Sequence, residues 1–300
     1  VAPNLTQHPN WHLIDHERCG ESNSDRIIGG EMAHLGQYPW IARLGYIRPH
    51  KGIFDVRKKG FKCGGSLISN VYVLTAAHCV TDLKGDVLAL IRLGEHDVRT
   101  RTDCEQDKCA PAVQDFAPKE VIVHKNYQNP AMRNDIALIR LDRPATIHSN
   151  ISKSEMENFI LLAAFVTPIC LPYGSLLTKN HVSERMEVAG WGVKDINSSK
   201  TSDVLLFVRI PVIEGKQCHK YLGKYTPIGK GQLCAGAQVG YDSCGGDSGG
   251  PLMHPEAPDG LPKYFLIGIV SFGSVRCGSD APAVYTDVAY YMKWILKNID

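Results

Sequence analysis

The sequence predicts a protein built almost entirely of β-strands, with one α-helix at its C-terminal end. Short apolar stretches bounded by Gly, Pro, Asn or Asp recur after residue 27, a spacing typical of β-barrels and β-sandwiches. These stretches predict strands at residues 40–47, 64–77, 120–127, 135–141, 186–193, 205–213, 264–273 and 283–288. Near the end, Val288, Met292, Ile295 and Leu296 recur at helical spacing, which predicts an amphipathic helix.

The composition is that of an ordinary globular protein and argues against two kinds of partner. Of the 300 residues, 44% are hydrophobic and 21% are charged, and the net charge is only +2. A charge this small gives no strong field for nucleic acid or an anionic membrane. The longest apolar run, residues 159–166, is shorter than the about 20 residues that span a bilayer. We therefore expect no nucleic-acid partner and no membrane span.

The chain divides into two parts of different pattern. Residues 1–26 are polar and lack periodicity, so they predict a linker ahead of a folded domain at 27–300. Residues 151–165 place a charged piece and then an apolar run where a short connection is expected. Whether they form an insertion stays open at this point.

Cysteines and glycosylation motifs indicate an oxidising, extracellular compartment. The ten cysteines are even in number and scattered, and none forms a C-x-x-C pair, which favours disulfides over a zinc or redox site. Acceptor motifs for N-glycosylation begin at Asn4, Asn150 and Asn197. Such triplets also occur by chance, but together with the cysteines they predict a secreted glycoprotein.

The stretch "YDSCGGDSGGPL" at 241–252 is the most informative for chemistry. Glycines flank Ser248 on both sides, and without Cβ atoms their backbone N–H groups can converge on a small volume. A serine hydroxyl beside two such donors would be a nucleophile with an oxyanion hole. The alternative is a flexible Gly-Ser turn.

Two further residues could activate this serine. His78 follows an apolar strand in "VLTAAHCV", and Asp135 precedes one in "RNDIALIRL". A serine nucleophile needs a base, and the base needs a group that orients it. Taken singly, the histidine could be an ordinary residue and the aspartate a turn residue. The three contexts together favour a catalytic set.

The motifs "TAAHC", "NDIAL" and "GDSGGP", in this order, resemble those of the chymotrypsin/trypsin family of serine proteases. The resemblance runs from Ile27 to the C-terminal helix. It implies two six-stranded antiparallel β-barrels with the active site between them, followed by the C-terminal α-helix. It also implies that His78 is the general base and acid, that Asp135 holds its tautomer, and that Ser248 attacks the scissile carbonyl. Catalysis would need no cofactor.

The same resemblance assigns roles around these three residues. The N–H groups of Gly246 and Ser248 would bind the oxyanion. Ser271 would support Asp135, and Phe272 would lie beside the substrate backbone.

The resemblance also implies that the chain is a zymogen. Cleavage between Arg26 and Ile27 would free the amine of Ile27, which would turn inward and pair with Asp247 beside Ser248. A buried charge pair is stable only while both partners are present, so the oxyanion loop would be misformed before cleavage. Residues 1–26 would then be the light chain.

Specificity follows from the predicted primary pocket. Asp242 matches the acidic base of the pocket in trypsin-like members, and a carboxylate there selects Arg or Lys. The walls would be Ser243, Gly273 and Ala283, and Ala283 stands where the family usually has Gly. Its methyl group predicts a tighter pocket with Lys weaker than Arg. Pro282 stands where sodium-activated relatives carry an aromatic residue, which argues against sodium regulation.

The mapping pairs all ten cysteines and points to a subfamily. The implied disulfides are Cys19–Cys170, Cys63–Cys79, Cys104–Cys109, Cys218–Cys234 and Cys244–Cys277. The small loop disulfide, the preceding "LGEHD" and the tether region "DHERCG" resemble arthropod clip-domain proteases, which include prophenoloxidase-activating and Toll-pathway members. The six-cysteine clip module itself is not in this sequence.

Acidic residues around the small disulfide could bind Ca²⁺, which prefers oxygen ligands. They are Glu95, Asp97, Asp103, Glu105 and Asp107. Relatives bind calcium at this place. A solvated acidic loop, balanced by neighbouring basic residues, is the alternative.

We thus predict a secreted serine endopeptidase zymogen of an extracellular cascade, in arthropod innate immunity or melanisation. Its partners would be a downstream zymogen or cytokine precursor, an upstream activating protease and a serpin-type inhibitor. The alternatives are a non-catalytic clip-type homologue that acts as a binding cofactor and a venom or digestive protease. The basic segment 47–62 predicts either an exosite for an acidic partner or a solvated loop.

Overall fold

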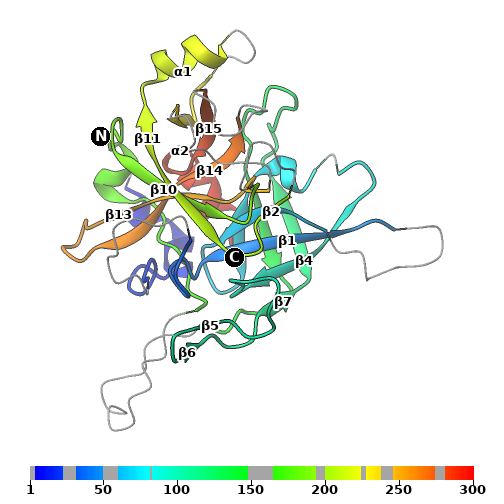
Figure 1. Cartoon of the computed structure of the whole chain (residues 1–300). Coiled ribbons are helices and arrows are strands. Elements are labelled where there is room, and N and C mark those ends of the chain that lie inside the picture. Colours follow the sequence, from blue (N-terminus) through cyan, green and yellow to red (C-terminus); the bar gives the residue numbers. More distant parts are fainter. Residues whose placement is uncertain are drawn as a thin grey trace.

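The computed structural model describes residues 4–22, 32–49, 60–81, 83–147, 165–193, 200–223, 228–237, 246–273 and 281–300. Strands dominate these residues, and one α-helix ends the chain (Figure 1). The strands of the first half are β1 (Ile41–Ile47), β2 (Gly60–Leu67), β3 (Tyr72–Thr75), β4 (Val87–Leu93), β5 (Cys104–Glu105), β6 (Lys108–Cys109), β7 (Gln114–Phe116), β8 (Pro118–Val123) and β9 (Ala137–Leu141). The second half contains β10 (Arg185–Gly190), β11 (Leu206–Ile213), α1 (Gly215–Leu222), β12 (Gln232–Gly236), β13 (Pro251–Glu256), β14 (Lys263–Phe272), β15 (Pro282–Asp287) and α2 (Val288–Lys297).

The first half forms an antiparallel sheet that curls almost into a barrel. Its strand order is β7-β4-β1-β2-β3-β9-β8. Strands β7 and β8 lie at opposite edges of this sheet, yet only Ala117 separates them in the sequence. The two edges must therefore meet, and β7 and β8 act as one bent strand. Counted in this way, the sheet has the six strands that the sequence resemblance implies.

The second half forms a closed six-stranded barrel in the order β10-β11-β12-β15-β14-β13. All of its pairings are antiparallel, and closure leaves no strand edge unpaired. The two sheets lie side by side, with α1 and the β5–β6 ribbon at opposite ends of the molecule (Figure 1). The predicted all-β fold of two barrels with a C-terminal helix is confirmed.

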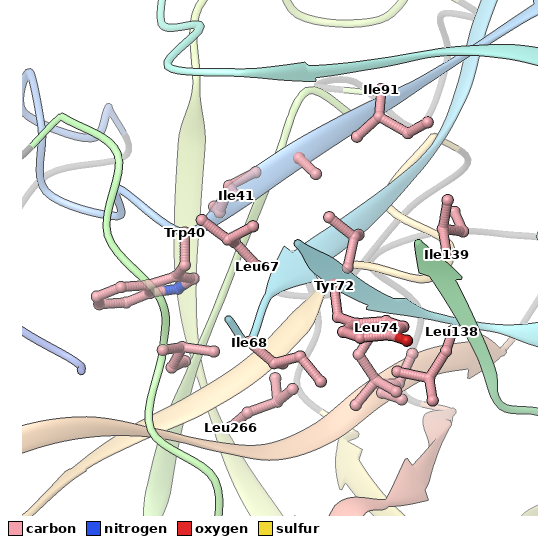
Figure 2. Packing of buried hydrophobic residues seen from close by; sticks show 14 of the residues in the cluster. Trp40, Ile41, Leu67, Ile68, Tyr72, Leu74, Ile91, Leu138, Ile139 and Leu266 are labelled. Carbon is pink, nitrogen blue, oxygen red and sulfur yellow. The ribbon is translucent and has the colours of Figure 1, made fainter. Parts of the chain in front are cut away.

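One apolar cluster joins the two halves of the molecule. It includes Trp40 and Leu67 from the first half and Leu266 from β14, all fully or almost fully buried (Figure 2). The indole Nε1 of Trp40 donates a hydrogen bond of 3.3 Å to Sδ of Met253 on β13. Burying a side chain of this kind contributes about 1.5–3 kcal/mol, so the shared cluster resists separation of the barrels.

Helix α2 has the buried face that its sequence pattern predicts. Val288, Met292, Ile295 and Leu296 are buried, with Tyr291 beside them. The helix begins after Asp287, whose side chain accepts a hydrogen bond of 3.1 Å from the N–H of Ala289 and so caps the first turn.

Residues 4–22, within the segment that was predicted as a linker, contain short helices and contact the end of the chain. Residues Leu5–Gln7 and Pro9–Leu13 form two short 3₁₀ helices. Side-chain Nδ2 of Asn10 donates to the carbonyl groups of Leu296 and Ile299, at 3.0 and 2.7 Å. These contacts join positions almost 290 residues apart, so no local sequence pattern could indicate them.

Six strands and one helix are not among the sequence predictions. The strands β4, β5, β6, β7, β12 and β13 lie in stretches for which no strand was predicted, and helix α1 has eight residues with only Cys218 buried. A disulfide joins Cys218 to Cys234 on β12, which fastens this short helix to the barrel. The disulfide therefore holds α1 against the barrel, whereas α2 is held there by its buried apolar face.

Four of the five predicted pairs form disulfides. They are Cys19–Cys170, Cys63–Cys79, Cys104–Cys109 and Cys218–Cys234. Several predicted features lie outside the described residues: the Cys244–Cys277 pair, the segment 151–164, and the sequons at Asn150 and Asn197. The third sequon residue, Asn4, is described and exposed. Within the described ranges, no helix is long and apolar enough to cross a membrane.

The packing of His16 predicts that docking of the N-terminal segment depends on pH. The His16 ring stacks on Trp11, with ring centroids 3.8 Å apart, and burial lowers its pKa below the usual 6.5. The undocked histidine binds a proton more readily than the docked one, so docking is strongest above pH 6.5 and weakens as the pH falls below that value. We expect residues 4–22 to become more sensitive to proteolysis at about pH 5, by this linkage.

Limited proteolysis across a pH series measures this effect. His16→Phe should keep the stacking and remove the pH dependence, whereas the same change at exposed His12 should leave the dependence in place. If His16→Phe and the unmodified chain lose protection in parallel as the pH falls, another group is responsible.

Candidate active site

His78 lies in a short turn that two restraints hold in place. It sits in the 3₁₀ turn Ala77–Cys79, directly after β3. The disulfide from Cys79 to Cys63 on β2 anchors the turn to the neighbouring strand. The His78 side chain is 21% exposed, so the ring has one face toward solvent.

Asp135 is a fully buried carboxylate that receives three hydrogen bonds. Oδ1 accepts from the backbone N–H of His78 at 2.9 Å, and Oδ2 lies 2.8 Å from its Nδ1. Oδ2 also accepts from Oγ of Ser271, on β14, at 2.5 Å. A buried carboxylate is stable only when it is hydrogen-bonded in this way. The arrangement orients His78 with Nδ1 toward Asp135 and Nε2 free of that carboxylate.

Ser248 is held between strands of both barrels. Its carbonyl accepts a hydrogen bond of 2.8 Å from Gly64 N–H on β2, and the next N–H, of Gly249, donates to Val270 on β14 at 2.8 Å. Gly249 has φ +76°, and a Cβ there would lie 2.2 Å from Oγ1 of Thr75. The residue directly after Ser248 therefore has a backbone conformation and a close contact that only glycine permits.

The backbone around Ser248 leaves two N–H groups available. Gly246 has φ +108°, in the region that glycine favours. Within residues 246–273 and the other described ranges, neither Gly246 N–H nor Ser248 N–H donates to a protein acceptor. As far as the described residues go, both could donate to a negatively charged oxygen of a substrate.

Asp247 points into a narrow crevice between the barrels. Its Oδ1 accepts a hydrogen bond of 2.8 Å from the N–H of Gly192. A Cβ at either Gly190 or Gly192 would lie 2.2 Å from an Asp247 oxygen, so the crevice needs both glycines. The predicted cleavage site, Arg26-Ile27, lies outside the described residues.

Arg43 lines the same crevice and was not predicted from the sequence. Its guanidinium carbon lies 4.3 Å from the ring centroid of Phe61 and 4.8 Å from that of Trp191. Burial lowers the pKa of Arg43 to about 10. An isolated Arg in a strand carries no sequence signal for such a position.

The predicted primary pocket is described only in part. Asp242 and Ser243 lie outside the described residues. Ala283 is buried on β15, and a Cβ built on Gly273 would lie 3.2 Å from the Ala283 methyl carbon. Phe272 pairs with Val284 in the adjoining strands. The methyl of Ala283, itself a predicted wall, therefore lies close to the backbone of Gly273, the other described wall.

Protein donors engage the carboxylates of the acidic loop. Glu95 contacts Arg92, and Asp97 contacts Arg99. Asp103 accepts from the N–H groups of His96 and Asp97, at 3.1 Å each. Glu105 accepts from Leu35 N–H at 2.8 Å and contacts His34.

As arranged among the described residues, these carboxylates do not converge on a common point, so they do not present a ready ligand set for Ca²⁺. Calcium binding by this loop stays a prediction. Exposed Asp107 lies at the tip of the ribbon, between β5 and β6.

Two of the basic residues of segment 47–62 pair with the same carboxylate. Arg48 Nε lies 2.6 Å from Oδ1 of Asp86, and Lys62 contacts Oδ2 of that residue. Residues 50–59 lie outside the described part of the chain. The predicted exosite therefore stays a prediction.

The sequence also did not predict two side chains that hold the Asn134–Asp135 stretch in place. Oγ1 of Thr286 donates to the backbone carbonyl of Asp135 at 2.7 Å, and Tyr291 donates to the Asn134 side chain at 2.9 Å. Both come from the C-terminal strand and helix. Only the closed second barrel brings them to this site.

The fold and this arrangement are those of a serine protease, and the chain belongs to the trypsin family, whose model "Trypsin" matches residues 27–295. Its relatives within that family include CLIP-domain serine proteases. It is 39% identical to CLIP domain-containing serine protease HP8 of Bombyx mori, over 97% of this chain and 74% of that protein. It is 38% identical to phenoloxidase-activating factor 3 of Holotrichia diomphalia, over 97% and 77%.

A solved structure agrees with these relatives. The crystal structure of the Drosophila Grass clip serine protease of the Toll pathway matches with a TM-score of 0.75 and 36% identity. The match covers 95% of this chain and 75% of that one. The resemblance found in the sequence is thereby confirmed at the level of family and subfamily.

The hydrogen bond from Ser271 predicts a measurable loss on its removal. Ser271→Ala leaves Asp135 with one donor fewer in a fully buried position. A hydrogen bond to a charged group contributes about 1.5–3 kcal/mol, so we expect kcat/KM to fall roughly 10- to 100-fold.

Hydrolysis of a small peptide ester measures this change. The matched control is Ser66→Ala, because Ser66 is also buried and its hydroxyl has no hydrogen-bond partner within the described residues. Full activity of Ser271→Ala would show that this hydroxyl does not matter for catalysis.

Proposed function

We propose that this chain is the protease part of a secreted zymogen that is activated at Arg26-Ile27 and cleaves protein substrates after arginine. The observation that carries the proposal is the Asp135 carboxylate, which orients His78 from one barrel while Ser271 of the other barrel donates to it. Ser248 lies on a loop tied to both barrels. These are the groups that acyl transfer to a serine requires.

The proposed chemistry gives each of these groups one role. His78 Nε2 accepts the proton of Ser248 Oγ as the hydroxyl attacks the scissile carbonyl. Asp135 keeps the other ring nitrogen protonated and stabilises the imidazolium that forms. The N–H groups of Gly246 and Ser248 donate to the developing oxyanion, and His78 then returns the proton to the leaving amine. Water repeats the sequence to release the acyl group.

The proposed switch uses Asp247. After cleavage, the amine of Ile27 would pair with this carboxylate, in the crevice where Gly190 and Gly192 admit no side chain. The pairing would form only in the cleaved chain, because the uncut chain has no amine at Ile27. Since Asp247 directly precedes Ser248, the pairing would align the N–H groups that bind the oxyanion.

The proposed setting is an extracellular cascade of arthropod innate immunity or melanisation. The names of the relatives support it, because they refer to phenoloxidase activation and to the Toll pathway. The substrate would be a downstream zymogen or a cytokine precursor. Its activator would be an upstream protease and its inhibitor a serpin-type protein.

Two alternatives remain weaker. A non-catalytic homologue would not need the Asp135–His78 contact that this chain retains. A digestive or venom protease would have less use for the Cys19–Cys170 bond, which ties the N-terminal segment to the body.

The proposed activation has a direct mutational test. We expect the intact chain to be inactive on a small arginine ester and to gain activity when a trypsin-like protease cuts it at Arg26. Arg26→Gln should remain uncut and inactive, while Arg18→Gln, in the same segment, should be activated normally. Ser248→Ala should be cut but stay inactive.

Mass spectrometry of the new N-terminus and initial hydrolysis rates give both readouts. Full activity of the uncut chain would refute the switch. Activity of Ser248→Ala would refute the nucleophile, and an inactive cut chain would favour the binding-cofactor alternative.

The pocket walls predict the order of preference at the cleaved bond. Since the Ala283 methyl lies close to the facing wall at Gly273, we expect Arg to be preferred to Lys, and Ala283→Gly to reduce that preference by improving Lys. One methyl group in a packed slot changes binding by about 1–3 kcal/mol, or roughly 5- to 150-fold. A peptide library measures it. Preference for Phe or Leu would refute the assignment of Asp242, and equal use of Lys would refute the role of Ala283.

A further inference from the structure

A group of ionisable side chains lies on the second barrel, outside the active site. His181 and Glu184 come from the turn before β10, and His254 and Glu256 come from the end of β13. His181 Nδ1 lies 2.7 Å from Oε2 of Glu184 and 3.8 Å from Oε1 of Glu256. That same Oε1 lies 3.0 Å from Nδ1 of His254.

Three of these side chains offer ligand atoms close enough to share one small cation, which would replace the present hydrogen bonds of 2.7 and 3.0 Å. With zinc bonds of about 2.0–2.2 Å, tetrahedral ligand atoms lie about 3.3–3.6 Å apart. The ligand atoms of His181, Glu184 and Glu256 all lie within 4.8 Å of one another. Imidazole nitrogen and carboxylate oxygen are ligands that suit Zn²⁺.

A lysine bridges the two carboxylates of this group. Lys179 Nζ lies 2.7 Å from Oε1 of Glu256 and 2.9 Å from Oε1 of Glu184. One ammonium group therefore serves two carboxylates and balances only one of their two negative charges. A divalent cation in place of the ammonium would balance both carboxylates.

Lys179 has room to leave. Its side chain is 30% exposed, and it borders a cavity of about 230 Å³ that Asp287 also lines. The displaced ammonium could turn toward solvent or toward this second carboxylate. By contrast, the other cluster of possible ligands, Cys63 with His78 and Cys79, has both of its sulfur atoms in a disulfide.

We propose that His181, Glu184, His254 and Glu256 form a zinc site in which the metal competes with Lys179. The bound metal fastens the turn before β10 to the end of β13. It takes no part in peptide hydrolysis, because within the described residues none of its ligands contacts Asp135 or Ser248.

Titration of zinc chloride into the intact chain tests this site. Ser248→Ala serves as the background, so that self-cleavage cannot change the sample, and calorimetry at about pH 7.5 gives the number of sites and their affinity. We expect His181→Ala and His254→Ala each to lose one site or weaken it by roughly tenfold or more. His219→Ala, which removes an exposed histidine on α1, should leave that site unchanged.

Lys179→Met separates a metal site from a plain ion-pair network. It keeps the length of the side chain and removes the competing charge, so zinc should bind at least several-fold more tightly and raise the melting temperature further. Melting in EDTA shows whether each variant still folds. Unchanged zinc affinity in both histidine variants, or weaker affinity in Lys179→Met, would overturn the proposal. Failure of the protease proposal would leave this result untouched, because the readout is binding.

Discussion

The buried carboxylate of Asp135 is the interaction on which the rest of the active site depends. It cannot stay ionised in the interior without donors, and its donors come from both halves of the molecule: His78 beside β3 and Ser271 on β14. Thr286 on β15 adds a hydrogen bond to its backbone carbonyl. The two barrels must therefore pack in one relative position for this carboxylate to be satisfied, and the same packing orients the imidazole. The packing that stabilises the interface between the barrels is therefore also the packing that sets the geometry of the active site.

Close backbone approach is the second constraint. The loop that carries Ser248 runs between β2 and β14, and at Gly249 there is no space for a side chain next to Thr75. The Asp247 carboxylate likewise lies against Gly190 and Gly192. Glycine is needed at these positions because distant parts of the chain come into close contact there, and not because the chain must be flexible. This explains why the glycine-rich motif can be recognised in the sequence although its contacts cannot.

Much of the fold was predictable because its signals are local. The strands β1, β9, β11 and β14 and the stripe of helix α2 agree with the apolar patterns that predicted them. What was missed has no local signal. The N-terminal segment is polar. Two contacts hold it in place: the hydrogen bond from Asn10 to Leu296 near the C-terminus, and the disulfide between Cys19 and Cys170. Helix α1 depends in the same way on the disulfide of Cys218.

The sequence alone determined the family, the fold class and the identity of the candidate catalytic residues, because short motifs keep the residue types that the chemistry needs in a fixed order. Only the tertiary structure decided which side chains surround them. Arg43 between two aromatic rings, the donors that engage the acidic loop, and the cluster of His181 and Glu256 all depend on strands from different parts of the chain. A sequence orders residues along a line, whereas desolvation, charge pairing and ligand geometry depend on distances in three dimensions.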